Sequence, residues 1–345
     1  MQENPNDMWW REDIYSLKLS HLQNRVSVLK AIRNYFDEEG FLEVETPILQ
    51  TAPGMEVHLQ AFKTEILTPQ LEERGELYLH TSPEFAMKKL LVAGMPKIYQ
   101  ICKCFRNAEG SSLHSCEFTM IEWYRTNESY ERIMQDCVEM FRLIANQLCI
   151  NYYRHKDFKA DPFQEWEKLT VCEAFIKYAR IDIEPVLDDL DGFKKLAESI
   201  DIKCSADDLW DDVFFRVFLE HIEPELGQGT PTIIYEYPVS MAALSRPKES
   251  DPRFAERFEI YCCGMELANA FGELTDAAEQ RRRYVEDMNL KERLYGYRWP
   301  VDEDFLRALE HGMPQASGIA LGIDRLVMLA TGAESIDDVL WTPKP

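Results

Sequence analysis

The first regular pattern along the chain is a run of apolar residues at helical spacing between residues 21 and 39. The apolar positions recur every three or four residues and are Leu22, Val26, Leu29, Ile32 and Phe36. This period predicts an amphipathic helix. Gly40 follows, where a left-handed residue commonly ends a helix, so we expect the helix to stop there.

The next segments alternate between apolar and polar residues, as strands do. Residues 41–47 alternate as far as Pro47, whose missing N–H ends a ladder of hydrogen bonds, and residues 76–80 predict a second strand. A helix is expected to follow, with Ser82 as its N-cap and Pro83 in its first position.

Two further alternating runs, 98–106 and 118–124, predict an antiparallel pair joined by a long polar loop. A helix, two strands and a closing strand–helix unit that turns at Gly322 are expected at 128–148, 232–237, 258–263 and 318–329. Hairpins with flanking helices and no alternation of parallel strands with helices favour an α+β fold with a mainly antiparallel sheet.

Residues 155–228 differ from the rest of the chain by their strong acidity and their helical stretches, such as 169–180 and 208–222. The segment contains the adjacent acidic pairs Asp188-Asp189, Asp207-Asp208 and Asp211-Asp212. We interpret it as a helical insertion on the surface of a catalytic domain. That domain is expected to span residues 21–345, behind an N-terminal segment of residues 1–20.

The balance of charge limits the function classes open to the chain. Its 345 residues include 61 acidic and 38 basic ones, which gives a net charge of -23 at pH 7. A protein that grips a nucleic acid neutralises many phosphates with Lys and Arg, so tRNA is not expected as a partner. The apolar stretches are too short to cross a bilayer, and Met1 to Asp13 is polar rather than signal-like. We therefore expect a cytoplasmic protein without membrane contact.

The nine cysteines lack any Cys-x-x-Cys spacing. Their odd count and their spacing argue against a disulfide framework or a zinc site and favour reduced, mostly buried thiols. His58, His80 and His114 have no ligand-like mutual spacing either. Of the three, only His114, in the polar loop, is expected near a phosphate group.

Arg106 ends one strand, and the strand that follows the loop carries Phe118, Glu122 and Tyr124 on a single face. An aromatic ring, a carboxylate and a phenol on one face suit the floor of a pocket. Phe118 would stack on a flat base, and Glu122 would hold a cationic group. Alternatively, Glu122 faces water at the edge of a sheet.

Arg325 falls in the first turn of the helix after Gly322. A helix N-terminus favours anions, and an arginine there strengthens an anion site. The alternative is a surface arginine paired with Asp324 or Glu334. Arg325 and Arg106 together predict a clamp for a nucleoside triphosphate that uses no glycine-rich phosphate loop.

Glu259 and Glu266 lie in otherwise apolar surroundings. Buried carboxylates need partners, and Mg²⁺ prefers carboxylate oxygens together with substrate phosphates. In a regular strand, the side chains of Asn269, Phe271 and Glu273 would point to one face and that of Glu266 to the other. Either the strand is irregular there, or these residues do not all line one site.

Four stretches resemble the motifs of class II aminoacyl-tRNA synthetases, the lysine-specific members above all. They are 41–49 (FLEVETPIL), 105–124, 258–276 with its Glu-x-x-Asn-x-Phe-x-Glu run, and 318–329 (GIALGIDRLVML). The resemblance covers residues 20–340 and implies the catalytic-domain fold of that family. Because only about 20 residues precede the first helix, too few for a separate domain, we expect no anticodon-binding domain.

This truncated form resembles the elongation factor P–lysine lysyltransferases, which are paralogues of the synthetases. The resemblance implies that ATP activates (R)-β-lysine as an aminoacyl-adenylate, which is transferred to a lysine side chain of elongation factor P. It also implies a homodimer. Ala320 stands where the synthetases usually have glycine, and its methyl group would favour β-lysine over lysine.

The resemblance further implies a role for each candidate site residue. The residues implied to bind ATP are Arg106, Glu109, His114, Phe118 and Arg325, and the two arginines are also the implied catalytic groups. Those implied to line the amino-acid pocket are Glu84, Glu122, Tyr124, Asn269, Phe271, Glu273 and Ala320. The implied Mg²⁺ ligands are Glu259 and Glu266. The chain departs from the family at Ala108, so Glu109, one place later, is expected to read the adenine edge.

Two other functions are compatible with these motifs. A truncated lysyl-tRNA synthetase that charges tRNA would share these motifs, although the net acidity and Ala320 count against it. A catalytically inactive module that binds nucleotide or amino acid is favoured by Ala108 alone, because both arginines and the metal carboxylates are present.

Overall fold

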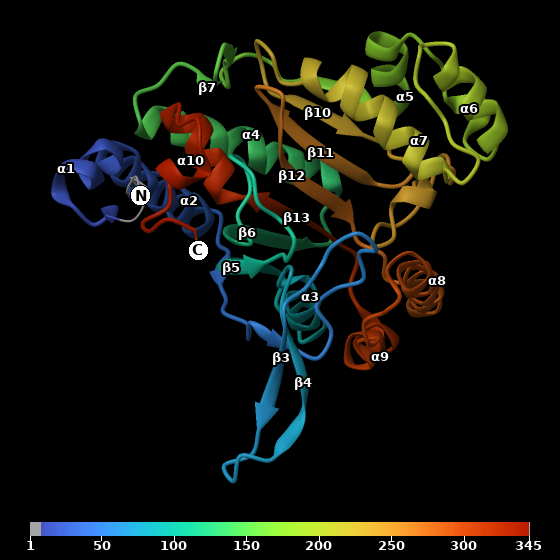
Figure 1. The fold of residues 1–345 in the computed structure, drawn as a ribbon, viewed down its shortest axis with the longest axis horizontal. Helices are drawn as coiled ribbons and strands as arrows, with labels where there is room; N and C mark the ends of the chain where they lie inside the picture. Colours follow the sequence, from blue (N-terminus) through green and yellow to red (C-terminus); the bar gives the residue numbers. More distant parts are fainter. Residues whose placement is uncertain (1–7, 345) are drawn as a thin grey trace, which may run out of the picture.

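An eight-stranded sheet runs through the protein in the order β1-β5-β6-β13-β12-β11-β10-β9 (Figure 1). The structure is a computed structural model that describes residues 8–344, so the first seven residues of the expected N-terminal segment 1–20 lie outside the described part. The outer pairs β1/β5 and β10/β9 are parallel, and the five pairs between them are antiparallel. The expected α+β class with a mainly antiparallel sheet is confirmed.

The elements have the following bounds. The strands of the large sheet are β1 (Leu42–Glu43), β5 (Lys97–Phe105), β6 (Glu117–Thr126), β9 (Glu167–Thr170), β10 (Thr232–Tyr235), β11 (Arg257–Cys262), β12 (Met265–Gly272) and β13 (Ala316–Gly322). Two small sheets contain β2 (Leu49–Gln50), β3 (Lys63–Leu67) and β4 (Glu73–Leu79), and β7 (Tyr153–His155) with β8 (Phe158–Ala160). The α-helices are α1 (Glu12–Tyr15), α2 (Leu19–Glu38), α3 (Glu84–Val92), α4 (Tyr130–Gln147), α5 (Val171–Ala174), α6 (Leu190–Glu198), α7 (Trp210–Val217), α8 (Ala277–Tyr295), α9 (Glu303–Gly312) and α10 (Ile323–Thr331).

One face of the sheet is covered by α2, α4 and α10 (Figure 1). Alternate residues of the central strands enter this core, among them Ile121 and Trp123 of β6 and Ile319 and Leu321 of β13. Because side chains alternate between the two faces of a strand, the residues in between point to the opposite face. That opposite face carries the predicted site.

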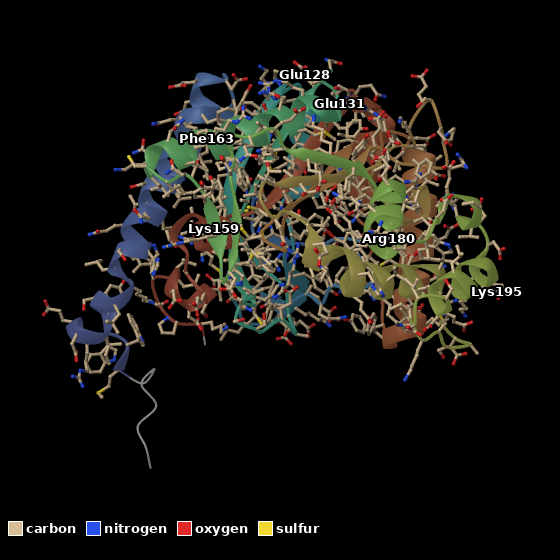
Figure 2. All side chains as sticks on the ribbon, turned by 90° about the horizontal axis from the view of Figure 1, so that it is seen from above. Glu128, Glu131, Lys159, Phe163, Arg180 and Lys195 are labelled. Carbon is tan, nitrogen blue, oxygen red and sulfur yellow. The ribbon has the colours of Figure 1, made fainter. Side chains whose placement is uncertain are left out.

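Two smaller apolar cores complete the molecule. One joins α5, α6 and α7 to strands β10 and β11, and the other joins α3, α8 and α9. Figure 2 shows Arg180 and Lys195 on the α5–α7 side, at the opposite end of the molecule from α1 and α2. The β3–β4 hairpin projects away from the main body (Figure 1).

The first helix follows its sequence pattern closely. Helix α2 spans Leu19–Glu38, and Gly40 has φ +74°, the left-handed conformation expected after its end. The strand expected over 41–47 is shorter, because only Leu42–Glu43 pairs with β5. The N–H of Val44 still donates to the carbonyl oxygen of Tyr99 at 2.8 Å, but regular pairing ends before Pro47.

The turn into α3 differs by one position from the prediction. The helix begins at Glu84, so Pro83 precedes its first residue instead of occupying it. Ser82 nevertheless accepts a hydrogen bond from the N–H of Glu84 at 3.0 Å, as an N-terminal cap does.

The acidic segment 155–228 holds more than helices. Helices α5 to α7 lie within it, as expected, and short π-helical turns continue α5 and α7. The segment also contributes β8 and the strand β9, which pairs in parallel with β10 at the edge of the large sheet. Helical periodicity therefore missed the part of the segment that extends the main sheet.

Candidate active site

A cavity of about 470 Å³ opens on the face of the sheet opposite α2, α4 and α10. This volume is in the range of pockets that bind small molecules. Nine of the predicted site residues line it: Arg106, Glu109, His114, Phe118, Glu259, Glu266, Asn269, Ala320 and Arg325. The first and the last of these come from segments more than 200 residues apart.

The strand register explains why these residues meet. One row across the sheet consists of Glu122, Ala320, Asn269 and Glu259, each directly opposite the next on neighbouring strands. Ala320 is the smallest member of this row, so it leaves space between Glu122 and Asn269. The next row contains Tyr124, Gly318, Phe271 and Arg257.

A β-bulge settles the parity of Glu266. Strand β12 pairs Ala268 with Ile260 but Glu266 with Tyr261, so Leu267 is an extra residue in the ladder. An extra residue reverses the alternation of side chains beyond it. Glu266 therefore lines the same cavity as Asn269, which the sequence left open.

Arg325 is held in place by contacts with two other elements. Its Nη1 donates to the backbone carbonyl of Glu266 at 2.7 Å, and its Nη2 contacts Nε2 of His114. Asp324 does not pair with it, because that carboxylate accepts from Arg25 at 2.6 Å and from the N–H of Thr119 at 2.7 Å. The structure therefore does not contain the ion pair between Arg325 and Asp324 that a surface role of this arginine would use.

Arg106 is available to a ligand. Its guanidinium lies over the ring of Phe118, 5.1 Å from the ring centre, and has no ion-pair partner within residues 8–344. Glu109 is half-buried and lines the cavity, whereas Ala108 is exposed and does not. The expected inward position of Glu109 agrees with this placement.

His114 contacts Arg325 and is neutral at pH 7. Burial and the charges of Arg325 and Arg106 lower its pKa to about 4. Its Nδ1 lies 2.9 Å from Oγ of Ser111. A neutral ring lets Nε2 accept a hydrogen bond from Arg325.

The two candidate metal ligands differ in their surroundings. Glu259 accepts hydrogen bonds from Tyr237 at 2.5 Å and from Tyr261 and Arg257 at 2.6 Å. Within the described part of the chain, no hydrogen bond to the carboxylate of Glu266 is present, and burial together with Glu259 raises its pKa to about 7. A carboxylate offers about four acceptor positions, so both residues keep oxygens for a divalent cation.

The far end of the site is a ring of buried carboxylates. Ser82 donates to Glu122 at 2.5 Å, and the hydroxyl of Tyr124 donates to the same carboxylate at 3.0 Å. Lys88, fully buried, lies 2.5 Å from both Glu84 and Glu273. Burial raises the pKa of Glu273 to about 7, against the opposing effect of Lys88. Glu122 is 1% exposed, so the alternative of a water-facing residue is wrong.

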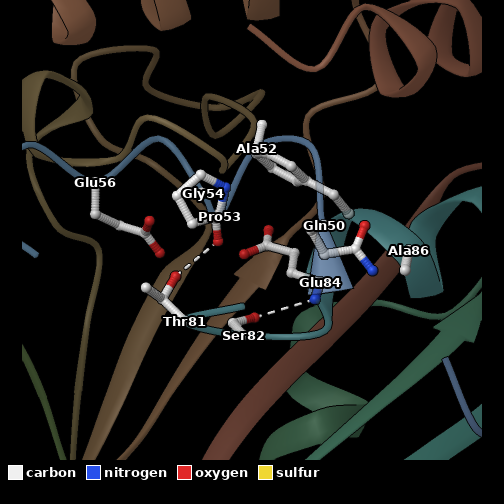
Figure 3. Close-up of a pocket in the computed structure, with 10 residues that line it drawn as sticks. Gln50, Ala52, Pro53, Gly54, Glu56, Thr81, Ser82, Glu84 and Ala86 are labelled. Carbon is white, nitrogen blue, oxygen red and sulfur yellow. Dashed lines mark hydrogen bonds between the residues drawn. The ribbon is translucent and has the colours of Figure 1, made fainter. Parts of the chain in front are cut away.

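A second, much smaller pocket of about 10 Å³ adjoins this ring (Figure 3). In Figure 3 the carboxylates of Glu56 and Glu84 face one another across it. Thr81 donates to the carbonyl of Pro53 at 2.8 Å and fixes one wall. Glu56 lines both cavities, so it joins the two parts of the site.

The structure adds four residues that the sequence analysis did not single out: Glu56, Lys88, Phe215 and Arg257. Lys88 stands four residues after Glu84 on one helix, and Arg257 two residues before Glu259 on one strand, so both had a detectable periodic signal. Glu56 and Phe215 had no such signal, because Glu56 lies in a loop and Phe215 lies in the acidic segment. The remaining predicted residue, Phe271, lies beside Gly318 in the second row.

Comparison with known proteins identifies the family to which the chain belongs. The family described as tRNA synthetases class II (D, K and N) matches residues 13–345. A protein of Edwardsiella ictaluri (strain 93-146) named elongation factor P–(R)-beta-lysine ligase is 40% identical over 328 residues, which are 94% of this chain and 95% of that protein. A protein of the same name from Proteus mirabilis (strain HI4320) is 40% identical over 330 residues, 95% of this chain and 96% of that protein. With this extent of similarity and the shared motifs, the chain belongs to the class II tRNA synthetase family, among the elongation factor P–(R)-beta-lysine ligases.

Proposed function

We propose that the protein uses ATP to activate (R)-β-lysine as an aminoacyl-adenylate and transfers the β-lysyl group to a lysine side chain of elongation factor P. The main support for this proposal is that two compartments of different chemistry lie side by side in the site. A cavity lined by Arg106 and Arg325 suits a triphosphate, and the ring of carboxylates beside it suits a diamine.

Charge balance supports a substrate with two ammonium groups. The ring contains three carboxylates, Glu84, Glu122 and Glu273, and one ammonium, that of Lys88. Buried charges need compensation, and burial already raises the pKa of Glu122 well above its usual range. Ammonium groups of a bound diamine would let Glu122 and Glu273 give up the protons that burial retains, whereas an apolar amino acid would leave them protonated.

In the first step, an oxygen of the substrate carboxylate attacks the α-phosphorus, and the bond to the β,γ-pyrophosphate breaks. Arg106 and Arg325 hold the phosphates and neutralise charge as it develops, and the carboxylate needs no general base. In the second step, a neutral lysine amine of elongation factor P attacks the acyl carbon. An amide forms, AMP leaves, and the amine loses a proton.

Mg²⁺ fits the donors at the metal end of the site. Glu266 and Glu259 would hold the ion, and Oδ1 of Asn269, a buried acceptor with no hydrogen-bond partner among the described residues, points to an unsatisfied polar site nearby. The ion would supply additional positive charge to the phosphates. Glu259 also keeps Tyr237 and Tyr261 oriented through its hydrogen bonds.

ATP–pyrophosphate exchange tests the activation step. We expect exchange that depends on (R)-β-lysine and is weaker with lysine. Exchange with neither isomer would contradict the proposal and favour the inactive binding module. Charging of tRNA in place of elongation factor P would instead favour a truncated lysyl-tRNA synthetase.

The proposal includes a homodimer and a cytoplasmic location. Leu42, Ile48 and Leu49, in the segment that follows α2, expose 38–55% of their surface, which suits a subunit interface around the first helix and strand. Among residues 8–344, no helix has both the length and the apolar character that crossing a bilayer requires. Light scattering of the purified chain would measure the mass of the assembly, and a monomer would contradict this part of the proposal.

A further inference from the structure

A cluster of soft ligand atoms lies beside the amino-acid pocket and has no part in the proposed reaction. Cys102 and Cys104 are two residues apart on β5, and His80 directly follows β4. The two Sγ atoms and one ring nitrogen of His80 lie within 4.8 Å of one another. Within residues 8–344 this is the one group of three or more His, Cys, Asp or Glu side chains that meets this distance.

The distances in this cluster are close to those around a tetrahedral metal ion. The Sγ atoms of Cys102 and Cys104 are 3.9 Å apart. Cys104 Sγ lies 4.0 Å from Nε2 of His80 and 4.0 Å from Sδ of Met120. In a tetrahedral site with metal–sulfur bonds of about 2.3 Å, neighbouring ligand sulfurs are about 3.8 Å apart. The two cysteine sulfurs thus already have nearly the separation of neighbouring ligands in such a site.

His80 provides an independent sign of a missing ligand. The ring is fully buried, and Nε2 donates to the backbone carbonyl of Lys103 at 2.7 Å. Nδ1 is buried and has no hydrogen-bond partner among the described residues. Because Nε2, the nitrogen 4.0 Å from Cys104 Sγ, is the one that donates to Lys103, Nδ1 is the nitrogen left for a metal ion, and it binds once the ring turns toward the sulfurs. An unpartnered buried nitrogen is unfavourable, and a bound cation would satisfy it.

We propose that His80, Cys102 and Cys104 bind a thiophilic d¹⁰ metal ion, Zn²⁺ or Cu⁺, with Met120 as a fourth ligand. Thiolate and thioether sulfur select such ions over Mg²⁺, which prefers oxygen. Each cysteine gives up its proton when the ion binds. Spacing along the chain argues against this site, because Cys-x-Cys is not a common zinc pattern and the histidine comes from another strand.

The site is close enough to the reaction centre to stabilise it. Met120 lines the large cavity, and His80 stands two residues before Ser82, which donates to Glu122 at 2.5 Å. A bound ion would fix the connection between β4 and α3 to strand β5. It would thereby hold the position of Ser82 below the amino-acid pocket.

Titration of the reduced full-length protein with Co²⁺ tests the proposal. We expect one equivalent to bind with the charge-transfer absorption of cobalt–thiolate bonds and the strong visible bands of a tetrahedral site. Zn²⁺ should displace it, and a parallel titration with Cu⁺ against a chromophoric chelator shows which of the two ions binds more tightly. Absence of thiolate absorption together with absence of a Cu⁺ equivalent would overturn the proposal.

Variants locate the site. Because loss of an outer partner typically weakens metal binding by about 10–100-fold, Cys104→Ser and His80→Ala, which each remove a ligand, should weaken it by about 100-fold or more. Cys149→Ser is the matched control, since Cys149 is an exposed thiol outside the cluster, and it should bind like the unmodified chain. If Cys104→Ser fails to fold, Cys102→Ser at the half-buried position replaces it. Unchanged affinity in these variants, or loss in the control, would contradict the site. The readouts need neither ATP nor an amino acid, so they are independent of the proposed function.

Discussion

At the scale of single residues, the site contains two arginine side chains that are available to a ligand and several buried carboxyls with raised pKa values. Arg106 has no ion-pair partner in the described part of the chain, and Arg325 contacts only a carbonyl and a neutral histidine. Within residues 8–344, neither guanidinium forms an ion pair with a carboxylate. Both are therefore available to phosphate oxygens, for which arginine is well suited.

Replacement of Arg325 should remove catalysis without unfolding the chain. We expect Arg325→Ala to slow pyrophosphate exchange by about 100-fold or more, because loss of one charge contact to a transition state costs roughly 3 kcal/mol. Arg282→Ala on the exposed face of α8 is the control and should keep its activity. Equal exchange rates in the two variants would remove Arg325 from the mechanism.

Binding of the amino acid should release protons near pH 7. The pKa of Glu273 is about 7 in the empty site, so this carboxyl is about half protonated there, and a bound ammonium group would lower its pKa. Calorimetry of β-lysine binding in buffers of different ionisation enthalpy measures this release. Glu273→Gln should reduce the release and weaken binding, and a release that persists in the variant would contradict the assignment.

At the scale of elements, close approach of strands β6, β12 and β13 brings the pocket together. Gly318 lies opposite Tyr124 on one side and Phe271 on the other. A Cβ at position 318 would come within 2.3 Å of the ring of Tyr124 and 2.8 Å of Glu273. Tyr124 is 3% exposed and cannot easily move aside.

Gly318→Ala should therefore destabilise the protein by about 1–3 kcal/mol, as overpacking of a core does. Gly322→Ala on the same strand is the matched comparison, because its nearest neighbour would be the carbonyl oxygen of Leu267 at 3.9 Å. Denaturant unfolding measures both changes. Similar losses in the two variants would show that crowding at Tyr124 is not the cause.

A buried ion-pair network ties α2, α4 and β6 together on the other face of the sheet. Asp136 is fully buried and accepts from Arg125 at 2.8 Å, from Trp123 at 3.1 Å and from Tyr35 at 2.9 Å. Removing one partner of a buried pair leaves an uncompensated charge, which typically costs about 3–5 kcal/mol.

Asp136→Ala should thus lower the free energy of unfolding by about that amount. Glu139→Ala, one turn further along α4, is the control, because Glu139 is half-buried and its loss leaves Tyr35 bonded to Asp136. Equal effects of the two substitutions would contradict the central place of Asp136.

Sequence patterns predicted the elements around the site better than the contacts within it. The helix at 21–39 and the pair 98–106 with 118–124 could be predicted, because each has a long and regular period. The orientation of Glu266 could not, since it depends on a bulge at Leu267 that no local pattern marks. Strand β9 was missed because four residues are too few for a period and its partner is distant in sequence.

At the scale of the whole molecule, the empty protein keeps several buried carboxyls protonated. Burial raises the pKa values of Glu266, Glu273 and Asp287 to about 7. Unfolding returns each to its ordinary value near 4. Between pH 6.5 and 7.5 the folded state thus binds more protons than the unfolded state, so stability should fall as pH rises.

Thermal unfolding of the ligand-free protein at pH 6.5 and 7.5 checks this. We expect these three groups to cost about 2 kcal/mol across that window, since each is about half protonated in the folded state near pH 7 and one proton per pH unit corresponds to about 1.4 kcal/mol. His114 opposes part of this loss, because its imidazole is about half protonated at pH 6.5 in the unfolded chain and neutral throughout the window in the folded chain. Stability that rises over the same window would contradict these pKa directions.

The most direct test of the central claim is the mass of elongation factor P after incubation with this protein, ATP, Mg²⁺ and (R)-β-lysine. The account predicts the gain of one β-lysyl group on a single lysine side chain, dependent on ATP and lost in Arg325→Ala. Elongation factor P of unchanged mass, in a reaction where tRNA becomes charged, would contradict it.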